Sequence, residues 1–202
     1  KGEDVGPLDY ELEPQERDWE DIWSPRDSEV QGLLDVAEES IRSSVRDLLP
    51  RARVIRKARA VGLVAGGQRG KAAALGRGAG KSWLPRESLD EAVLRLHHDL
   101  KHANGGRGVA LPFCAFNGGS DVWCDVGTKR VGVDGLRKVL GLVPECVLHI
   151  GDQFLDTGND HAARQSCPCL WITNVGETKQ VIKHVLRDAL GLAEIKDRSW
   201  AA

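Results

Sequence analysis

The sequence predicts an α/β protein in which a partial, Rossmann-type parallel sheet fills the carboxyl-terminal part and follows an α+β lobe. From about residue 116 onward, apolar runs alternate with amphipathic stretches, as in parallel strands joined by crossover helices. Before that point, two amphipathic stretches flank a strand-rich segment. Hydrophobic residues at 41% and charged residues at 29% of 202 residues are typical of a globular chain with one core or two small lobes.

We therefore divide the chain into three parts. Residues 1–27 are polar and interrupted by prolines, which predicts an extended arm. Residues 28–115 form the predicted α+β, cap-like lobe, and residues 116–202 form the carboxyl-terminal half of the parallel-sheet core.

Two amphipathic helices are predicted in the first lobe. Ser28 with Gln31, and Ser88 with Glu91, have the spacing of a capping box, so each serine is expected to open a helix. Apolar residues then recur at intervals of three and four, which predicts one buried face on each helix. These residues are Val30, Leu33, Leu34, Ala37, Ile41, Val45 and Leu48 in the first helix, and Leu89, Ala92, Val93, Leu96 and Leu100 in the second.

Between these helices, residues 53–65 predict one or two strands, and residues 66–83 predict a glycine-rich, basic, mobile loop. The loop contains Gly-Lys-Ser at 80–82, which invites a phosphate-loop interpretation. That motif needs a glycine where Leu75 stands, so an ATPase of this class is disfavoured.

The second part predicts a regular series of elements. Two short strands surround Gly118-Gly119, and the later strands are buried and apolar. Asn174 and Glu177 are expected to cap the last helix. The strands are predicted within 111–119, 121–127, 146–152 and 169–174, and the helices within 131–142, 159–167 and 177–190.

Composition excludes several classes of function. A formal net charge of −2 gives no basic field for nucleic acid, and with 3 Phe, 6 Trp and 1 Tyr there are few aromatic side chains for base stacking. No apolar run is long enough for a bilayer span, and the acidic first residues lack a secretory layout, which predicts a cytoplasmic protein. The five cysteines are expected to be reduced; zinc held by Cys167, Cys169 and a distant histidine is the disfavoured alternative.

Lys129 and the segment 149–160 are the candidate site. An apolar strand delivers Asp152 at its carboxyl end, where ligands of open α/β sheets gather. A strand-end carboxylate suits Mg²⁺, with Asp156 and Asp160 as reserve ligands, and Lys129 is expected to neutralise phosphate charge in the same crevice. Singly, each aspartate is more often a turn former and a lysine is more often solvated surface; the ordered set is the informative signal.

This set, Lys129 followed by residues 135–160, resembles the third and fourth motifs of the haloacid dehalogenase-like phosphatase superfamily. More narrowly, residues 112–136, 148–164 and 170–178 resemble the carboxyl-terminal part of the IMP-specific 5′-nucleotidase family. The similarity extends back through 54–64 and 86–94, and the glycine-rich loop is a local departure from it.

The resemblance implies a partial haloacid dehalogenase-like fold and Mg²⁺-dependent hydrolysis of IMP to inosine and phosphate. It also implies a homo-oligomer that responds to ATP. By position, Asp152 matches the metal-binding aspartate, Lys129 the phosphate-contacting lysine, and Asp121 a substrate-contacting residue. A carboxylate at Asp121 suits a ribose hydroxyl or a base N–H, and its alternative is a turn aspartate.

The sequence departs from the superfamily in one respect. The chemistry uses an Asp-x-Asp pair, whose first carboxylate attacks phosphorus and whose second protonates the leaving group. No aspartate of this chain is followed two residues later by another. Because the chain begins at Lys1 and contains no methionine, we expect a carboxyl-terminal fragment that is inactive alone and exposes a sheet edge. The alternative is a non-catalytic nucleotide-binding or assembly module derived from such a phosphatase.

Overall fold

The computed structural model describes residues 25–65, 84–185 and 187. The glycine-rich loop, with its Gly-Lys-Ser run, and nearly all of the expected arm lie outside these residues. In chain order the described elements are α2 (Asp27–Asp47), β1 (Ala52–Arg56), β2 (Ala60–Ala65), α3 (Arg86–Gly106), β3 (Phe113–Asn117), β4 (Asp121–Val126), α4 (Lys129–Val139), η3 (Pro144–Cys146), β5 (His149–Gly151), η4 (His161–Gln165), β6 (Cys169–Trp171) and α5 (Val175–His184).

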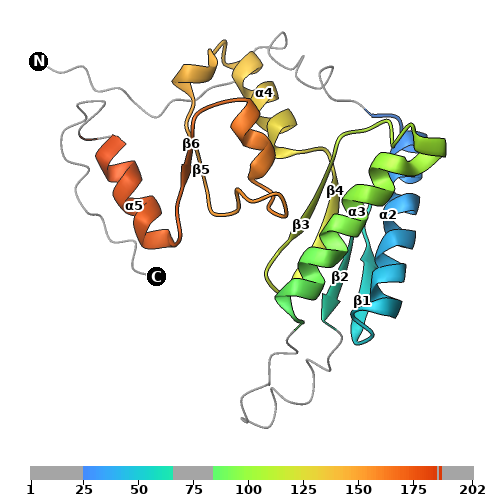
Figure 1. Cartoon of the computed structure of the whole chain (residues 1–202). Helices are drawn as coiled ribbons and strands as arrows, with labels where there is room; N and C mark the ends of the chain where they lie inside the picture. The colour runs from blue at the N-terminus through green and yellow to red at the C-terminus, as the bar shows by residue number, and fades with distance from the viewer. Residues whose placement is uncertain (1–24, 66–83, 186, 188–202) are drawn as a thin grey trace, which may run out of the picture.

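The first structural unit is an antiparallel sheet with helices α2 and α3 on one face (Figure 1). Its strand order is β1-β2-β4-β3, so the hairpin β1–β2 joins the hairpin β3–β4 through β2 and β4. Gly62 of β2 lies opposite Trp123 of β4, and Ala115 of β3 lies opposite Cys124. The strand-rich segment after α2 is therefore a hairpin, as one of the two sequence alternatives predicted.

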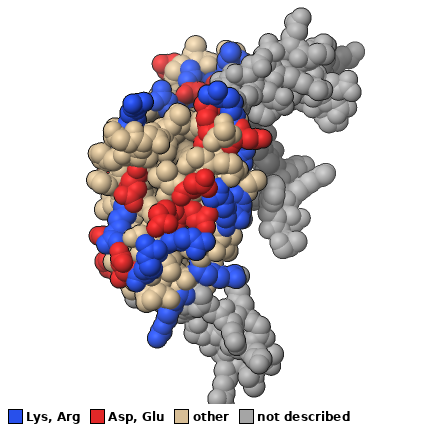
Figure 2. Space-filling view, turned by 90° about the vertical axis from the view of Figure 1, so that its right-hand side faces the viewer, with Lys and Arg blue, Asp and Glu red and all other residues tan. Residues whose placement is uncertain are grey.

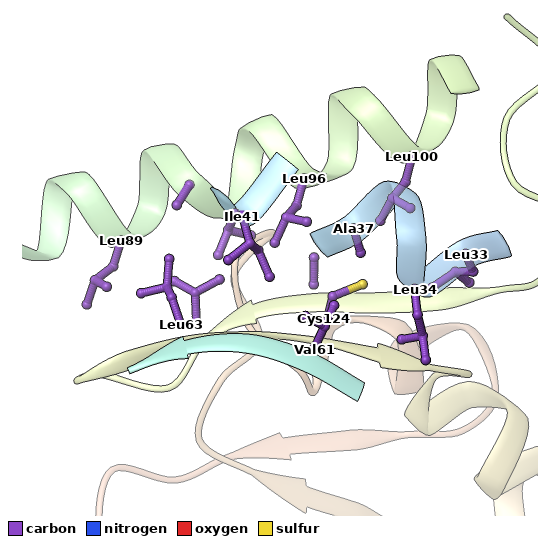
Figure 3. Close-up of a cluster of buried hydrophobic side chains, with 14 of the residues drawn as sticks. Leu33, Leu34, Ala37, Ile41, Val61, Leu63, Leu89, Leu96, Leu100 and Cys124 are labelled. Atoms are coloured by element: carbon purple, nitrogen blue, oxygen red, sulfur yellow. The ribbon is translucent and has the colours of Figure 1, made fainter. Parts of the chain in front are cut away.

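The hydrophobic core lies between this sheet and the two helices (Figure 3). All five apolar residues predicted for the face of α3 are buried, whereas Val45 and Leu48, predicted for α2, are only partly buried. Each fully buried leucine stabilises the fold by about 1.5–3 kcal/mol. The sheet contributes Val61, Leu63, Val122 and Cys124 to the same core.

Both helices begin before the predicted caps, α2 one residue before Ser28 and α3 two residues before Ser88. At α2 the N-cap is Arg26, whose backbone N–H donates to Glu29 Oε2 at 3.1 Å, so the reciprocal bond of a capping box forms around Glu29. At α3 the N-cap is Pro85, which lacks an N–H and already has a helix-compatible φ. The predictions that Ser28 and Ser88 open the helices are wrong for these reasons.

The parallel-sheet prediction is correct for β5 and β6 and wrong for β3 and β4. His149–Gly151 and Cys169–Trp171 pair in parallel. In contrast, the turn at Gly118-Gly119, where Gly119 has φ +88°, folds β3 and β4 into a hairpin of the antiparallel sheet. The lobe boundary expected between 115 and 116 therefore falls inside β3, and the antiparallel sheet continues to Val126.

The second structural unit contains the parallel pair with α4, η4 and α5 (Figure 1). Asn174 caps α5 as predicted, accepting from the Glu177 N–H at 3.0 Å, while the helix predicted at 159–167 is only the 3₁₀ segment η4. Neither α4 nor α5 buries a side chain completely. Most large exposed apolar side chains of the described residues lie here: Leu136, Leu140, Leu142, Val143, Leu148, Leu155, Leu170, Trp171, Val175 and Ile182.

The surface over α2 and α3 carries charges of both signs. Figure 2, which looks onto this side of the molecule, shows acidic and basic side chains intermixed without a continuous basic field. Arg56 pairs with Asp35 and with Glu38, each at 2.8 Å. Among the described helices, none has the length and apolar content that a bilayer crossing requires.

Candidate active site

A cavity of about 410 Å³ lies between the two structural units. One wall comes from the start of α3 and the β3–β4 hairpin, and the other from the loop after β5 and from β6. A hydrogen bond from the Asn117 N–H to the Thr157 carbonyl, at 2.8 Å, joins these walls. The lining residues are Arg86, Asp90, Asn117, Gly119, Asp152, Gln153, Leu155, Thr157, Gly158 and Trp171.

The loop after β5 is organised by the carboxylate of Asp160. Oxygen Oδ2 accepts from the backbone N–H groups of Asp152 and Gln153, at 3.1 and 3.0 Å. A Cβ added at Gly151 would lie 2.4 Å from the Asp160 Cγ, so this close approach requires glycine. The end of the strand and the start of η4 are thus held against each other.

Oxygen Oδ1 of Asp160 meets the two basic side chains of the site. Lys129 Nζ donates to it and also to Asn159 Oδ1, the latter at 3.1 Å, and His149 Nε2 lies 2.7 Å from Asp160 Oδ1. Only 1% of the Asp160 side chain is exposed, against 40% for Lys129. Burial raises the pKa of Asp160, but hydrogen bonds from Lys129 and His149 outweigh it and hold the pKa below its usual value.

Lys129 and Asp152 are therefore connected through Asp160. Lys129 opens α4, where the Thr128 side chain caps the helix by accepting from the Val131 N–H at 3.3 Å. Asp152 lines the cavity, whereas Lys129 reaches Asp160 from outside the lining set. The sequence indicates Asp160 only as a reserve metal ligand, and its role in fixing both predicted residues is visible only in the structure.

The carboxylate of Asp152 is available to a ligand. Its backbone is engaged, since its N–H donates to Asp160 and its carbonyl accepts from Trp171 Nε1 at 3.0 Å. Within the described part of the chain, no hydrogen bond or ion pair engages its side chain, which lines the cavity. Trp171 is 54% exposed, its ring centroid lies 6.0 Å from that of Phe154, and it lines the same cavity.

The donor set at Asp152 fits a hard cation in part. A free carboxylate oxygen is the ligand type that Mg²⁺ prefers, and Mg²⁺ commonly keeps several waters and substrate oxygens. Among the described residues, no group of three or more His, Cys, Asp and Glu side chains is placed to hold a metal. Asp152 would therefore supply one ligand, and substrate, water or other groups would supply the rest. The same finding gives no support to zinc at Cys167 and Cys169; the Cys169 thiol instead donates to the Cys167 carbonyl.

Asp121 lies at the start of β4, opposite Val64 of β2. Its Oδ1 occupies the space beside Gly118, 2.1 Å from where a Cβ on that residue would lie, and its carbonyl accepts from the Gly118 N–H. Asp121 does not line the cavity, although Asn117 and Gly119 on the same hairpin do. Its assignment as a substrate-contacting residue stays a prediction.

Apart from the turn residue Gly119, four cavity residues outside the predicted segment 149–160 are not indicated by the sequence: Arg86, Asp90, Asn117 and Trp171. Three of them belong to the antiparallel unit, and nothing local in the sequence indicates that the start of α3 faces the loop after β5. The hydrogen bond from Asn117 Nδ2 to Asp90 Oδ1, at 2.9 Å, joins residues 27 positions apart.

A protein-family model and the curated relatives of this chain indicate the same protein family. A family model described as IMP-specific 5′-nucleotidase matches residues 11–182. The curated IMP-specific 5′-nucleotidase 1 of Schizosaccharomyces pombe is 38% identical over 77% of this chain and 35% of its own length. That of Plasmodium falciparum is 35% identical over 78% of this chain and 34% of its own length. The chain thus spans about a third of these relatives.

Solved structures give the same result. An N-terminally truncated, IMP-bound IMP-nucleotidase of Plasmodium falciparum superposes with a TM-score of 0.72 at 31% identity, over 85% of this chain and 42% of that one. An ATP-bound structure of the IMP-nucleotidase from that organism has a TM-score of 0.66 at 30% identity, over 87% and 37%. The predicted haloacid dehalogenase-like fold class is thereby confirmed.

Proposed function

Because the chain belongs to the IMP-specific 5′-nucleotidase family, we propose that it is a carboxyl-terminal portion of a Mg²⁺-dependent hydrolase that converts IMP to inosine and phosphate. The observation that carries this proposal is the joined arrangement of Lys129, Asp160 and the Asp152 loop beside a cavity between two structural units.

The residues divide into a phosphate end and a nucleoside end. Asp152 would hold the metal, which would neutralise phosphate charge and polarise the phosphoryl oxygens. Lys129, kept in place by Asp160, adds a second positive charge where negative charge develops. The remaining cavity, with the exposed face of Trp171, accommodates the nucleoside.

We propose that the nucleophile comes from polypeptide outside these 202 residues, because the chain contains no Asp-x-Asp pair. A two-stranded parallel sheet supports this, since such sheets are normally extended and covered on both faces. The exposed apolar side chains between 136 and 182 that lie outside the cavity form the surface that further chain would cover. Alone, the chain should therefore bind nucleotide without hydrolysing it.

The second candidate is a non-catalytic nucleotide-binding or assembly module. The observation that favours it is the same missing pair, since Lys129 and Asp152 can hold a phosphate and a metal without any attacking group. For either function we propose a cytoplasmic homo-oligomer. We also propose that ATP acts as an effector, because one similar solved protein is ATP-bound.

Calorimetric titration of the 202-residue chain with IMP, with and without Mg²⁺, tests binding. We expect binding that depends on Mg²⁺, and we expect Asp152→Asn to remove most of that dependence. The matched control is Asp156→Asn, whose carboxylate lies in the same loop, is 88% exposed and is absent from the cavity lining. An affinity for IMP that changes neither with Mg²⁺ nor with Asp152→Asn would refute the proposed metal site.

Phosphate release by the complete gene product separates the two functions. Hydrolysis of IMP in preference to AMP and GMP supports the nucleotidase, and Lys129→Ala should then lower the rate by about a hundredfold or more. IMP binding with no turnover by the complete product would favour the non-catalytic module.

A further inference from the structure

Asp90 and Arg86 form an ion pair on the wall of the cavity that belongs to the antiparallel unit. They lie one turn apart at the start of α3, and both line the cavity together with Asp152. Arg86 Nε lies 3.7 Å from Asp90 Oδ2, beyond a normal hydrogen bond. The guanidinium and this carboxylate oxygen therefore form a long ion pair without a hydrogen bond, and each can still hydrogen-bond to a ligand.

Asn117 fixes the orientation of Asp90. Its side-chain N–H donates to Asp90 Oδ1 at 2.9 Å, and its side-chain oxygen accepts from the Gly119 N–H at 2.8 Å. Asn117 itself is only 9% exposed, so the amide is held by the surrounding strand and turn. Oxygen Oδ2 of Asp90 is left for a ligand, beside an Arg86 side chain that is 72% exposed and able to move onto it.

This arrangement is the complement of one edge of a purine. Hypoxanthine carries an N–H donor at N1 next to a carbonyl acceptor at C6, whereas adenine carries an acceptor at N1 next to an amino donor. A carboxylate accepts and a guanidinium only donates, so with the carboxylate at N1 and the guanidinium at C6 the pair matches hypoxanthine and mismatches both adenine groups. The exchanged register would match adenine, so the register of the base is part of the assignment.

We propose that Asp90 accepts a hydrogen bond from N1–H of hypoxanthine while Arg86 donates to its C6 carbonyl. Asn117 is the positioning residue for Asp90. This inference rests on the proposed function, because it deepens the specificity of the same cavity. Guanine presents the same N1–H and C6 carbonyl, so the pair selects against AMP and does not select against GMP.

The test is competitive binding of IMP, GMP and AMP to the 202-residue chain in the presence of Mg²⁺. We expect IMP and GMP to bind more tightly than AMP. Asp90→Asn offers a donor as well as an acceptor, so the ratio of IMP affinity to AMP affinity should fall at least about tenfold, as for a lost hydrogen bond to a charged group. Arg86→Gln should lower the same ratio, and it alters an exposed side chain whose loss leaves the fold intact.

Glu87→Gln is the matched control. It removes one charge from the same first turn of α3 at an exposed position outside the cavity lining, and the ratio should not change. An unchanged ratio in both Asp90→Asn and Arg86→Gln, with IMP still bound, overturns the base-edge assignment and leaves the proposed function standing. A wild-type chain that binds none of the three nucleotides refutes the proposed function and this inference with it. If Asp90→Asn fails to fold, as judged by circular dichroism, Arg86→Gln alone decides.

Discussion

Replacing Asp160 by asparagine should destabilise the protein more than any other loss of a single carboxylate in the loop after β5. The two oxygens of Asp160 accept from two backbone N–H groups on one side and face Lys129 and His149 on the other. The asparagine oxygen can accept either from the two backbone N–H groups or from Lys129 and His149, but not from both sets. Its side-chain NH₂ group then faces the donors of the other set. About two donors lose their acceptor, each at a cost of about 1–3 kcal/mol where they are buried.

The charge itself adds less, because the Lys129 side chain is 40% exposed and its ammonium can be hydrated when the carboxylate is lost. The expected loss of stability is about 2–6 kcal/mol from the hydrogen bonds alone. For a chain of this size, each kcal/mol lowers Tm by about 2–4 °C, so Asp160→Asn should melt at least about 4 °C below the wild type.

Thermal unfolding followed by circular dichroism at pH 7 measures this difference, with Asp156→Asn as the control. Asp156 is 88% exposed, and its only ion pair among the described residues is with His161 at 3.4 Å, so its variant should melt within about 2 °C of the wild type. Equal melting temperatures for the two variants would show that Asp160 does not organise the loop.

The same variant gives a pH dependence. The pKa of Asp160 is lower in the folded protein than in the unfolded chain, so the ionised carboxylate stabilises the fold at neutral pH. This contribution is complete above the unfolded pKa of about 4 and is lost as pH falls through the lower folded value. The difference in Tm between wild type and Asp160→Asn should therefore shrink on acidification below about pH 4. A difference that is constant from pH 7 to pH 2 would contradict the assigned pKa shift.

Other predictions concern the glycine beside Asp160, the core and the thiols. Gly151→Ala should lower Tm because its Cβ would meet the Asp160 carboxylate at 2.4 Å. Gly132→Ala, at a helical position with open space around it, should instead raise the stability by about 0.5–1 kcal/mol. Thermal melting curves compare the two variants, and equal changes in Tm would refute the close contact at Gly151. Leu96→Ala should cost about 2–5 kcal/mol in urea unfolding because this side chain is fully buried, and Leu94→Ala, on the same helix but 56% exposed, should cost less than about 0.5 kcal/mol. Cys146 is the one exposed cysteine among the described residues, so Cys146→Ser should abolish the fast phase of thiol labelling, and a fast phase that survives would contradict the assigned burial.

Much of the fold could be predicted because its signals are local. The periodicity of Leu89, Val93 and Leu96 determines which face of α3 is buried, whatever that face packs against. The error at β3 and β4 arose because a short apolar strand looks the same in a parallel sheet and in a hairpin. Gly118-Gly119 indicated the turn between them, but its pairing with β2 depends on tertiary packing that no short segment encodes.

The candidate site was predictable only on the side that is continuous in sequence. Asp152 follows an apolar strand, which is only partly buried in the structure, and Lys129 lies at the start of a helix, so both could be proposed as residues of one edge of the sheet. The central role of Asp160 could not be derived, because burial and four converging contacts turn an ordinary loop aspartate into a fixed anchor. Arg86 and Asp90 reach the cavity only because α3 is laid across the sheet, an arrangement with no sequence motif.

Asn117 is attached to both walls of the cavity: its main chain bonds to Thr157, and its side chain bonds to Asp90. These two hydrogen bonds of Asn117, at the end of β3, connect the loop that carries Asp152 to the start of α3. The two walls are therefore joined before any ligand binds, which limits the reorganisation that binding requires.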